Sequence, residues 1–519
     1  MKISRKAILA SGSKFHSQFG IIANIRTYNI HMAEIETLTD RSHFTTADTV
    51  AQIWKHLGLP AEALASLSLP DADKHLLSGL PSSFKIGHLA QSTIALSALA
   101  AALFQSTRNK SNIPKVIVPL LHACLEFQSE KLYTLVGQKA DLGGGLKKFG
   151  GPVQKTADGY VRIHDGFPHH VEGALKILGL PPTATRDEFR SALLRRKSVD
   201  LETAAMKANC VIAALRTYEQ WDALPQATYI PNVPVQIEKL GSGAPVQPPQ
   251  LPDGSGRCLR GIRVLELSRV IAAPVAGRTL AAHGADVLWI TSPNLPDLPD
   301  IDRDLARGKR TAQLDLTTEC GRAKLLELAK NADVFIQGYR PGSLAAKGFS
   351  PSELAQANPN IICANMSAYG NEGPWGRNRG FDSIVQTGSG MNVSEAEHFG
   401  EGEAGRPMPC QALDHASGFF LATSICAALY KRATEGGSYE VNVSLAATMK
   451  YLRSLGQFPG KTGFDCPATG DQEIGEYLET EESGFGELKA LKHSAAVEGY
   501  MPGWDIMPKP LGSDKPEWV

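Results

Sequence analysis

The residue of this sequence that is best placed to do chemistry is Asp414, in the run PCQALDHASG at residues 409–418. The small and apolar residues that follow, FFLATSICAALYKR, predict a helix too apolar to lie on a surface. An aspartate at the start of a helix faces unpaired backbone N–H groups and the positive end of the helix dipole, which keep its carboxylate ionised and offer donors to the oxyanion of an acyl adduct. Asp414 is therefore a candidate nucleophile for acyl transfer, although an aspartate in this position is also a common helix cap.

Other residues and motifs indicate chemistry less strongly. We expect Cys410 to be a buried, unreactive thiol, and we expect His415 and the pair His169-His170 to be structural or capping groups. The run GQFPGKT at 456–462 has only three residues between its glycines, where a phosphate-binding loop has four. The eight cysteines are scattered without a CxxC pair, and the sequence contains no HExxH or GxSxG motif. We therefore expect no bound metal and a reducing compartment.

Beyond residue 259 short apolar runs alternate with helical stretches. This order predicts an α/β fold with a doubly wound parallel, Rossmann-like sheet in the C-terminal half. Ligands bind such sheets at the carboxyl ends of the strands. The expected strands are IRVLELS (262–268), DVLWIT (286–291), TAQLDL (311–316), DVFIQG (333–338), IICANMS (361–367) and YEVNVSL (439–445).

The N-terminal half has a different pattern, mainly helical and of the α+β class. Asp158-Gly159 predicts a hairpin turn within it. The segment GSGAPVQPPQLPDGSG, rich in Gly, Pro and Ser, predicts a linker and a domain boundary. The expected divisions are a leader at 1–40, an N-terminal domain at 41–240, the linker at 241–258, a catalytic domain at 259–450 and an extended C-terminal arm at 451–519.

The two halves contain one similar stretch. The run that begins IGHLAQSTIALSALAAALF can be laid over QALDHASGFFLATSICAALY, with Ala102-Leu103 on Ala428-Leu429. In this overlay His88 falls where Asp414 stands. The overlay predicts that the N-terminal half is a degenerate partial copy that has lost its carboxylate.

Composition limits the partners that the chain can have. Fifty-three basic residues balance 53 acidic ones, so the overall charge does not indicate nucleic acid or an anionic membrane as a partner. The apolar stretches near Ile94–Phe104 and Phe419–Leu429 are shorter than the roughly 20 residues that a membrane span requires. We therefore expect no membrane segment.

The first 33 residues are basic and contain no acid before Glu34. Such a leader is typical of a mitochondrial transit peptide. The alternative is that translation begins at Met32 and that the leader is an extension or a disordered tail. The expected location is the cytoplasm, or the mitochondrion if the leader is a targeting signal.

Residues 259–450 resemble CoA-transferase family III, the CaiB/BaiF family, which includes formyl-CoA transferase, carnitine CoA-transferase and the α-methylacyl-CoA racemases. The resemblance rests on LRGIRVLELSRVIAAPVAGRTLAAHGADVLWI, RGKRTAQLDL, ADVFIQGYRPGSLAAKGF, NPNIICANMSAYGNEGPW, RGFDSIVQTGSG and the block around Asp414, in the family order. Residues 81–225 resemble part of the same family, since KTADGYVRIHDGFPHH is similar to its small-domain hairpin.

The resemblance implies that the chain is a CoA-transferase with Asp414 as its catalytic carboxylate. Asp414 would attack an acyl-CoA and form first a mixed anhydride and then an aspartyl-CoA thioester, from which a carboxylic acid takes the CoA. The implied cofactor is coenzyme A, as substrate and product, and the implied partners are an acyl-CoA and a carboxylic acid. Family members form interlocked homodimers, so we expect a homodimer or, because of the partial copy, an internal pseudo-dimer.

The resemblance also implies which residues contact CoA. Lys309, Arg310 and Arg340 are the expected partners of its phosphates, because a neutral protein must supply that charge locally. The sequence has Ser292 and Ala346 where family members often have arginine. The expected contacts are Val270, Ile271, Ala272, Gly308, Lys309, Arg310, Gly338, Tyr339 and Arg340.

Two alternatives to CoA transfer stay open. In the racemase branch a histidine precedes the aspartate of the motif seen here as Gly380-Phe381-Asp382, and it works with the catalytic aspartate as an acid/base pair. Phe381 cannot transfer a proton, so racemisation is less favoured than transfer. The second alternative is a non-catalytic scaffold that binds acyl-CoA.

Overall fold

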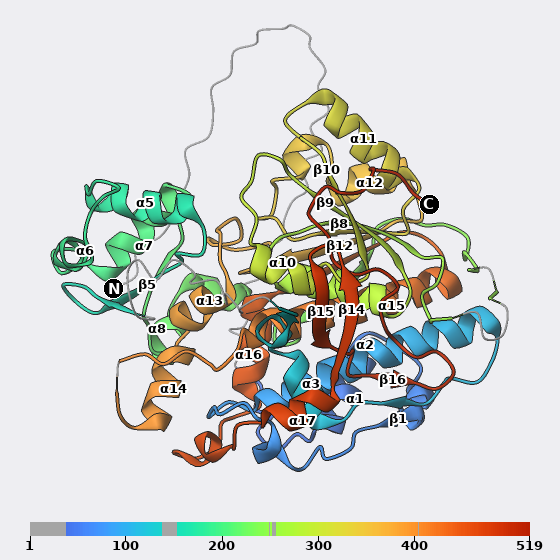
Figure 1. Cartoon of the computed structure of the whole chain (residues 1–519), viewed down its shortest axis with the longest axis horizontal. Coiled ribbons are helices and arrows are strands. Elements are labelled where there is room, and N and C mark those ends of the chain that lie inside the picture. The colour runs from blue at the N-terminus through green and yellow to red at the C-terminus, as the bar shows by residue number, and fades with distance from the viewer. Residues whose placement is uncertain (1–37, 138–152, 249, 252–255, 403) are drawn as a thin grey trace, which may run out of the picture. The chain divides into compact units, whose positions relative to one another are not determined.

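The computed structural model describes residues 38–137, 153–248, 250–251, 256–402 and 404–519 (Figure 1). Leu38–Val519 form one compact unit. The predicted leader lies outside the described residues, apart from residues 38–40.

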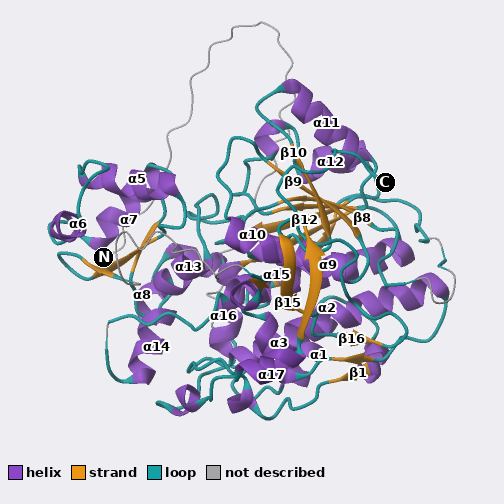
Figure 2. Cartoon of the chain, in the orientation of Figure 1, coloured by secondary structure: helices purple, strands orange, loops and turns teal. Residues whose placement is uncertain are grey.

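A seven-stranded sheet organises the C-terminal half (Figure 2). Its order is β10-β9-β8-β11-β12-β13-β7; all neighbours are parallel except β7, which pairs antiparallel with β13 at one edge. The predicted parallel sheet is therefore confirmed, and its strand order reverses between β8 and β11, where such sheets bind ligands. The strands are β7 (Val235–Lys239), β8 (Arg263–Leu267), β9 (Asp286–Thr291), β10 (Lys309–Gln313), β11 (Val334–Gln337), β12 (Ile362–Ser367) and β13 (Tyr439–Ser444).

Helices cover both faces of this sheet. Val264 of β8 belongs to the larger hydrophobic core with α9 and α15, whereas its neighbour Leu265 packs with α11 and α12 on the other face. Strands buried on both faces explain why the sequence shows continuous apolar runs here. The α-helices between β8 and β13, not all of which cover the sheet, are α9 (Ala272–Ala282), α10 (Pro299–Leu305), α11 (Glu319–Lys330), α12 (Pro351–Ala357), α13 (Asp382–Gly388), α14 (Met391–Phe399) and α15 (Ala412–Glu435).

The N-terminal half contains the long helix α2 (Ile86–Asn109), which packs against α15. Both helices have 24 residues, and His88 and Asp414 are each the third residue of their helix. The lengths of the two helices thus agree with the overlay. That the whole N-terminal half is a degenerate partial copy of the C-terminal half stays a prediction. Both are longer than the apolar stretches expected from sequence and are apolar enough to cross a membrane, but the apolar window of each is entirely buried within the protein, as core helices are.

A smaller α+β layer follows in the N-terminal half. Its strands β4, β5 and β6 form an antiparallel sheet, and Thr156 N donates to the Gly159 carbonyl across the predicted hairpin turn. The remaining elements of this half are α1 (Thr46–His56), α3 (Leu120–Glu126), α4 (Ser129–Leu132), β4 (Gln154–Lys155), β5 (Tyr160–Ile163), α5 (Pro168–Leu178), α6 (Arg186–Leu193), α7 (Ser198–Lys207), β6 (Ile212–Ala214) and α8 (Tyr218–Asp222), with the short strands β1 (Leu67–Ser68), β2 (Val116–Ile117) and β3 (Thr134–Leu135).

Residues before and after the predicted linker at 241–258 belong to one hydrophobic core. The edge strand β7 precedes this segment, and Val246 N donates to the carbonyl of Arg432 at the end of α15. Buried charges also join the halves, since Asp304 of α10 pairs with Arg278 of α9 and accepts from Ser129 Oγ of α4 at 2.6 Å. The Gly- and Pro-rich segment therefore runs between parts of one core, and its role as a boundary between sequence domains stays a prediction.

The region predicted as an extended arm, 451–519, contains both regular and extended structure. The hairpin of β14 and β15 pairs with β3 of the N-terminal half, whereas the last residues are largely irregular. Ile506 accepts from Gly308 N at 2.7 Å, and Trp518 Nε1 donates to the Leu328 carbonyl at 3.0 Å. The regular elements are α16 (Leu445–Ser454), α17 (Asp471–Glu476), β14 (Leu478–Ser483), β15 (Gly486–Leu491) and β16 (Ala496–Val497).

The close crossing of α15 and α9 depends on Gly418. A Cβ atom at this position would lie 2.6 Å from the Ala272 carbonyl oxygen and 2.6 Å from Val275 Cβ. We expect Gly418→Ala to be about 1–3 kcal/mol less stable than the control Gly475→Ala, because both changes replace a helical glycine by a better helix former and only the first overpacks. Gly475 lies in α17 with nothing near its missing Cβ. Denaturant unfolding measures the difference, and equal stability of the two variants would contradict this account of the crossing.

Candidate active site

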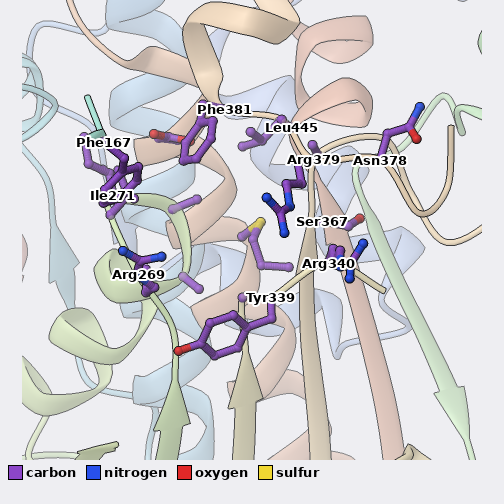
Figure 3. A pocket seen from close by; sticks show the side chains of 18 of the residues that line it. Phe167, Arg269, Ile271, Tyr339, Arg340, Ser367, Asn378, Arg379, Phe381 and Leu445 are labelled. Atoms are coloured by element: carbon purple, nitrogen blue, oxygen red, sulfur yellow. The ribbon is translucent and has the colours of Figure 1, made fainter. Parts of the chain in front are cut away.

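A cavity of about 330 Å³ lies at the carboxyl ends of β8, β11 and β12 (Figure 3). The first residues of α15, the loop before α13 and the start of α5 complete its wall. The sheet edge is the one where a parallel sheet is expected to bind ligands. The lining residues are Phe167, His169, His170, Arg269, Val270, Ile271, Ala272, Ala273, Leu295, Gly338, Tyr339, Arg340, Ser343, Met366, Ser367, Ala368, Asn378, Arg379, Gly380, Phe381, Asp414 and Leu445.

Asp414 lines this cavity and is 5% exposed. The cap of α15 is a different residue, Asp382, whose Oδ2 accepts from Leu413 N at 2.8 Å and from Asp414 N at 3.1 Å. Gln386 Nε2 donates to the other oxygen of Asp382. The alternative that Asp414 is merely a helix cap is therefore not supported, because Asp382 fills that role.

The environment of Asp414 differs from the one expected for an aspartate at a helix start. Burial raises the pKa of the Asp414 carboxyl well above its usual range, and the neighbouring carboxylates of Asp382 and Glu130 raise it further. Burial also raises the pKa of Asp382 to about 6, although the hydrogen bonds that it accepts act in the opposite direction. Desolvation and the like charges therefore act against the ionised form that the helix start was expected to favour.

Glu130 reaches this site from α4 of the N-terminal half. Its Oε2 lies 3.0 Å from His415 Nε2, and both side chains are buried. The ring of His415 stacks on Phe127, with centroids 5.5 Å apart. His415 is thus held by packing and by a carboxylate, as expected of a structural histidine.

Six of the nine predicted CoA contacts line the cavity: Val270, Ile271, Ala272, Gly338, Tyr339 and Arg340. Val270 directly follows the loop residue Arg269 and has φ of 68°, a left-handed conformation that β-branched residues rarely adopt. Strained backbone of this kind clusters at functional sites. A Cβ on Gly338 would lie 2.9 Å from that of Ala273, so this position requires glycine for the close approach of the two segments.

The other three predicted contacts, Gly308, Lys309 and Arg310, are not in the cavity. Lys309 is fully buried, with Nζ 2.9 Å from Glu266 Oε1, and Arg310 forms a forked pair with Asp286. β10 begins at Lys309, so this turn lies at the amino edge of the sheet and not at the carboxyl edge. The prediction that Lys309 and Arg310 hold the phosphates of CoA is corrected, because both charges are used within the protein.

Several wall residues were not predicted. Arg269 lies over the ring of Phe167, at 4.4 Å from its centroid, and Arg379 extends into the cavity from the loop before α13 (Figure 3). Both could have been found from sequence, since Arg269 follows the first strand and Arg379 precedes the GFD motif. His169 and His170, expected to be structural, also lie in the wall, and His170 Nδ1 is 3.0 Å from His164 Nδ1.

Phe381 occupies the position at which the racemase branch has its histidine. Its ring stacks on that of His164 with centroids 3.8 Å apart. Among the described residues, no group of three or more His, Cys, Asp or Glu side chains is arranged to hold a metal ion.

Comparisons with known proteins find CoA-transferases among the similar proteins. Residues 259–462 match the model of CoA-transferase family III. A probable fatty acyl-CoA transferase of Mycobacterium tuberculosis is 34% identical over 200 residues, which are 36% of this chain and 50% of the relative. An acetyl-coenzyme A transferase of Hypoxylon pulicicidum is 34% identical, and the match covers 42% of this chain and 37% of the relative. A formyl-CoA:oxalate CoA-transferase of Streptomyces coelicolor is 31% identical, and the match covers 37% of this chain and 48% of the relative.

A crystal structure of the M. tuberculosis protein is 32% identical and covers 38% of this chain and 58% of that one, with a TM-score of 0.35. The chain spans about half the length, or less, of these curated relatives. The match of residues 259–462 confirms the resemblance predicted from sequence: this part of the chain is similar to CoA-transferase family III.

Proposed function

We propose that this chain transfers CoA from an acyl-CoA to a carboxylic acid through covalent adducts on Asp414. One observation carries the proposal. The Asp414 carboxylate lines a cavity at the carboxyl ends of parallel strands, while Asp382 caps the helix. The match of residues 259–462 to the family supports the same reaction.

In the first half of the reaction, an oxygen of Asp414 attacks the thioester carbonyl of the acyl-CoA. The carbon–sulfur bond breaks, which leaves a mixed anhydride on Asp414 and free CoA thiolate. The thiolate then attacks the aspartyl carbonyl of the anhydride and releases the original acyl group as a carboxylate. The product is an aspartyl-CoA thioester.

The second half repeats these steps with the acceptor acid. Its carboxylate attacks the aspartyl thioester, expels the thiolate and forms a new anhydride; the thiolate then attacks the acceptor carbonyl and restores Asp414. A carboxylate suits this route because it forms both an anhydride and a thioester.

The wall of the cavity suggests how CoA is held. Arg269 lies beside Val270 and over Phe167, so it can supply the positive charge for the CoA phosphates that Lys309 and Arg310 cannot supply. The segments at Val270 and at Tyr339 then line the path to Asp414. Racemisation is not favoured, since Phe381 offers no proton-transfer group.

The partners of the reaction are an acyl-CoA and a carboxylic acid, and we propose that a single chain is sufficient. α2 packs against α15 within the chain, and His88 has the helix position of Asp414 but no carboxylate. The chain would then be an internal pseudo-dimer with one nucleophile.

Replacement of the nucleophile tests the reaction. We expect Asp414→Asn to lower CoA transfer by about four orders of magnitude or more, because the amide cannot form the anhydride. The matched control is Asp471→Asn, an exposed aspartate at the start of α17. Transfer is measured over a panel of acyl-CoAs and acids, with circular dichroism to show that both variants fold. Full activity of Asp414→Asn would disprove the mechanism, and a silent wild-type protein would favour a scaffold.

The pH dependence tests the environment of Asp414. Only the ionised carboxylate attacks, and burial, Asp382 and Glu130 all raise its pKa, so kcat/KM should fall as pH decreases through a value well above the ordinary aspartate pKa. Glu130→Gln removes one negative neighbour, lowers the pKa of Asp414 and moves this acid limb to lower pH. The exposed Glu327→Gln on α11 is the control, and its profile should match the wild type. An acid limb that is unchanged, or moved to higher pH, in Glu130→Gln would contradict the assignment.

A further inference from the structure

The buried pair of Lys309 and Glu266 connects elements that form one wall of the Asp414 cavity. Lys309 is the first residue of β10 and Glu266 lies in β8, so the lysine side chain reaches across β9 to its partner. Its Nζ is 2.9 Å from each carboxylate oxygen of Glu266 and 2.9 Å from the Pro274 carbonyl oxygen, in the first turn of α9. One ammonium group therefore joins two strands to the helix that packs on them.

The pair also holds the segment that precedes α9. Ser268 Oγ donates to Glu266 Oε1 at 2.5 Å, and the Ser268 carbonyl accepts from Trp289 Nε1 at 3.1 Å. A Cβ atom on Gly277 would lie 1.8 Å from Glu266 Oε2, so α9 lies directly against this carboxylate. These contacts, with the one in the first turn of α9, hold both ends of the segment 268–274.

This segment contains a strained residue of the cavity wall. Val270 has φ of 68°, which a β-branched residue adopts only when its surroundings impose it. The pair supplies such surroundings, because its hydrogen bonds fix the chain at Ser268, two residues before Val270, and at Pro274, four residues after it. The residues between them line the cavity from Arg269 to Ala273.

The same segment lies next to Asp414. Gly418 of α15 is so close to α9 that a Cβ atom there would be 2.6 Å from the Ala272 carbonyl oxygen. Asp414 is one helical turn before Gly418, on the same face of α15, and lines the cavity. Its attack on a thioester carbonyl creates an oxyanion, which needs hydrogen-bond donors at fixed positions. The N–H groups of Ala272 and Ala273 have no partner within α9, because they belong to its first turn, and can donate to this oxyanion.

A buried ion pair is an unusual way to join two strands and a helix. Desolvation of both charges offsets most of their attraction, so apolar residues of similar volume stabilise a core equally well or better. Both side chains are fully buried here, and burial lowers the pKa of Lys309 and raises that of Glu266. Stability alone therefore does not account for the pair, whereas its directed hydrogen bonds to Ser268 and Pro274 do.

We propose that Glu266 and Lys309 are positioning residues of the transferase. They hold the strained segment 268–274 in the conformation that places the N–H groups at the start of α9 beside the acyl carbonyl, and they touch neither substrate. This inference rests on the proposed function. It gives Lys309 a role in place of the CoA contact that was predicted from sequence.

A neutral double variant, Glu266→Gln/Lys309→Met, tests this role. It nearly keeps the volume of the pair but removes both charges and the donor to the Pro274 carbonyl. We expect kcat for CoA transfer to fall about tenfold or more, while KM for acyl-CoA changes less than about threefold, because the donors act on the transition state. The variant should unfold at nearly the same denaturant concentration as its control, since a buried ion pair adds little stability.

The matched control is Asp333→Asn/Arg432→Met. Arg432 is also buried, lies 2.8 Å from Asp333 Oδ1 and donates to a backbone carbonyl, as Lys309 does. Asp333 directly precedes β11, so this pair lies at the amino edge of the sheet, away from the cavity. The control should transfer CoA with the kcat and KM of the wild type.

Hydrogen exchange separates this proposal from the proposed function, because it requires no transfer activity. Val275 N donates to the Ile271 carbonyl at 2.8 Å and closes the first turn of α9. In the double variant of Glu266 and Lys309 this amide should exchange about tenfold faster or more, read by mass spectrometry. Amides at the start of α15, and all of these amides in the control, should keep the wild-type rates.

Faster exchange at Val275 together with a lowered kcat supports the positioning role. Faster exchange in a protein that transfers no CoA would still show that the pair holds the segment, and only the proposed function would fail. Unchanged exchange, an unchanged kcat or a rise in KM alone would overturn the role and leave the transferase intact. A double variant much less stable than its control would also overturn it, because the pair would then serve stability.

Discussion

The capping of α15 by Asp382 is the interaction on which the site depends. Two backbone N–H groups at the start of this buried helix donate to one carboxylate oxygen, so the helix start is satisfied without Asp414. Asp414 then lies in the cavity wall with its carboxylate close to a second acid. Its burial and its acidic neighbours hold it as a poorly solvated, basic carboxylate, which is suited to attack a thioester once ionised.

The remaining structure fixes this helix in place. α2 and α9 pack against α15, and the absence of a side chain at Gly418 allows α9 to approach closely. α4 of the N-terminal half brings Glu130 to His415, one residue beyond Asp414. The small layer adds Phe167 and His170 to the cavity wall. The N-terminal half therefore supplies part of the wall of the cavity and a carboxylate beside the start of α15.

The sequence predicts the parallel sheet well, because strands buried on both faces appear as continuous apolar runs between helices. It also places Asp414 correctly at a helix start. The sequence did not show which carboxylates pair with the charged residues. Lys309 and Arg310 look like a phosphate site in sequence, but Glu266 and Asp286 neutralise them. The position of Lys309 and Arg310 just before a predicted strand did indicate that they lie at the amino edge of the sheet. Neither Asp382 as the cap nor Glu130 as a neighbour could be predicted, because both contacts join residues far apart in the chain.

Chemical trapping tests the central claim that Asp414 carries the covalent intermediates. Hydroxylamine attacks an aspartyl anhydride or thioester and leaves a stable hydroxamate on the side chain. Peptide mapping of the protein after treatment with acyl-CoA and hydroxylamine should find this hydroxamate on Asp414, and only when acyl-CoA is present. A wild-type protein that transfers CoA but carries no hydroxamate, or carries it on Asp382 or Glu130, would contradict the account.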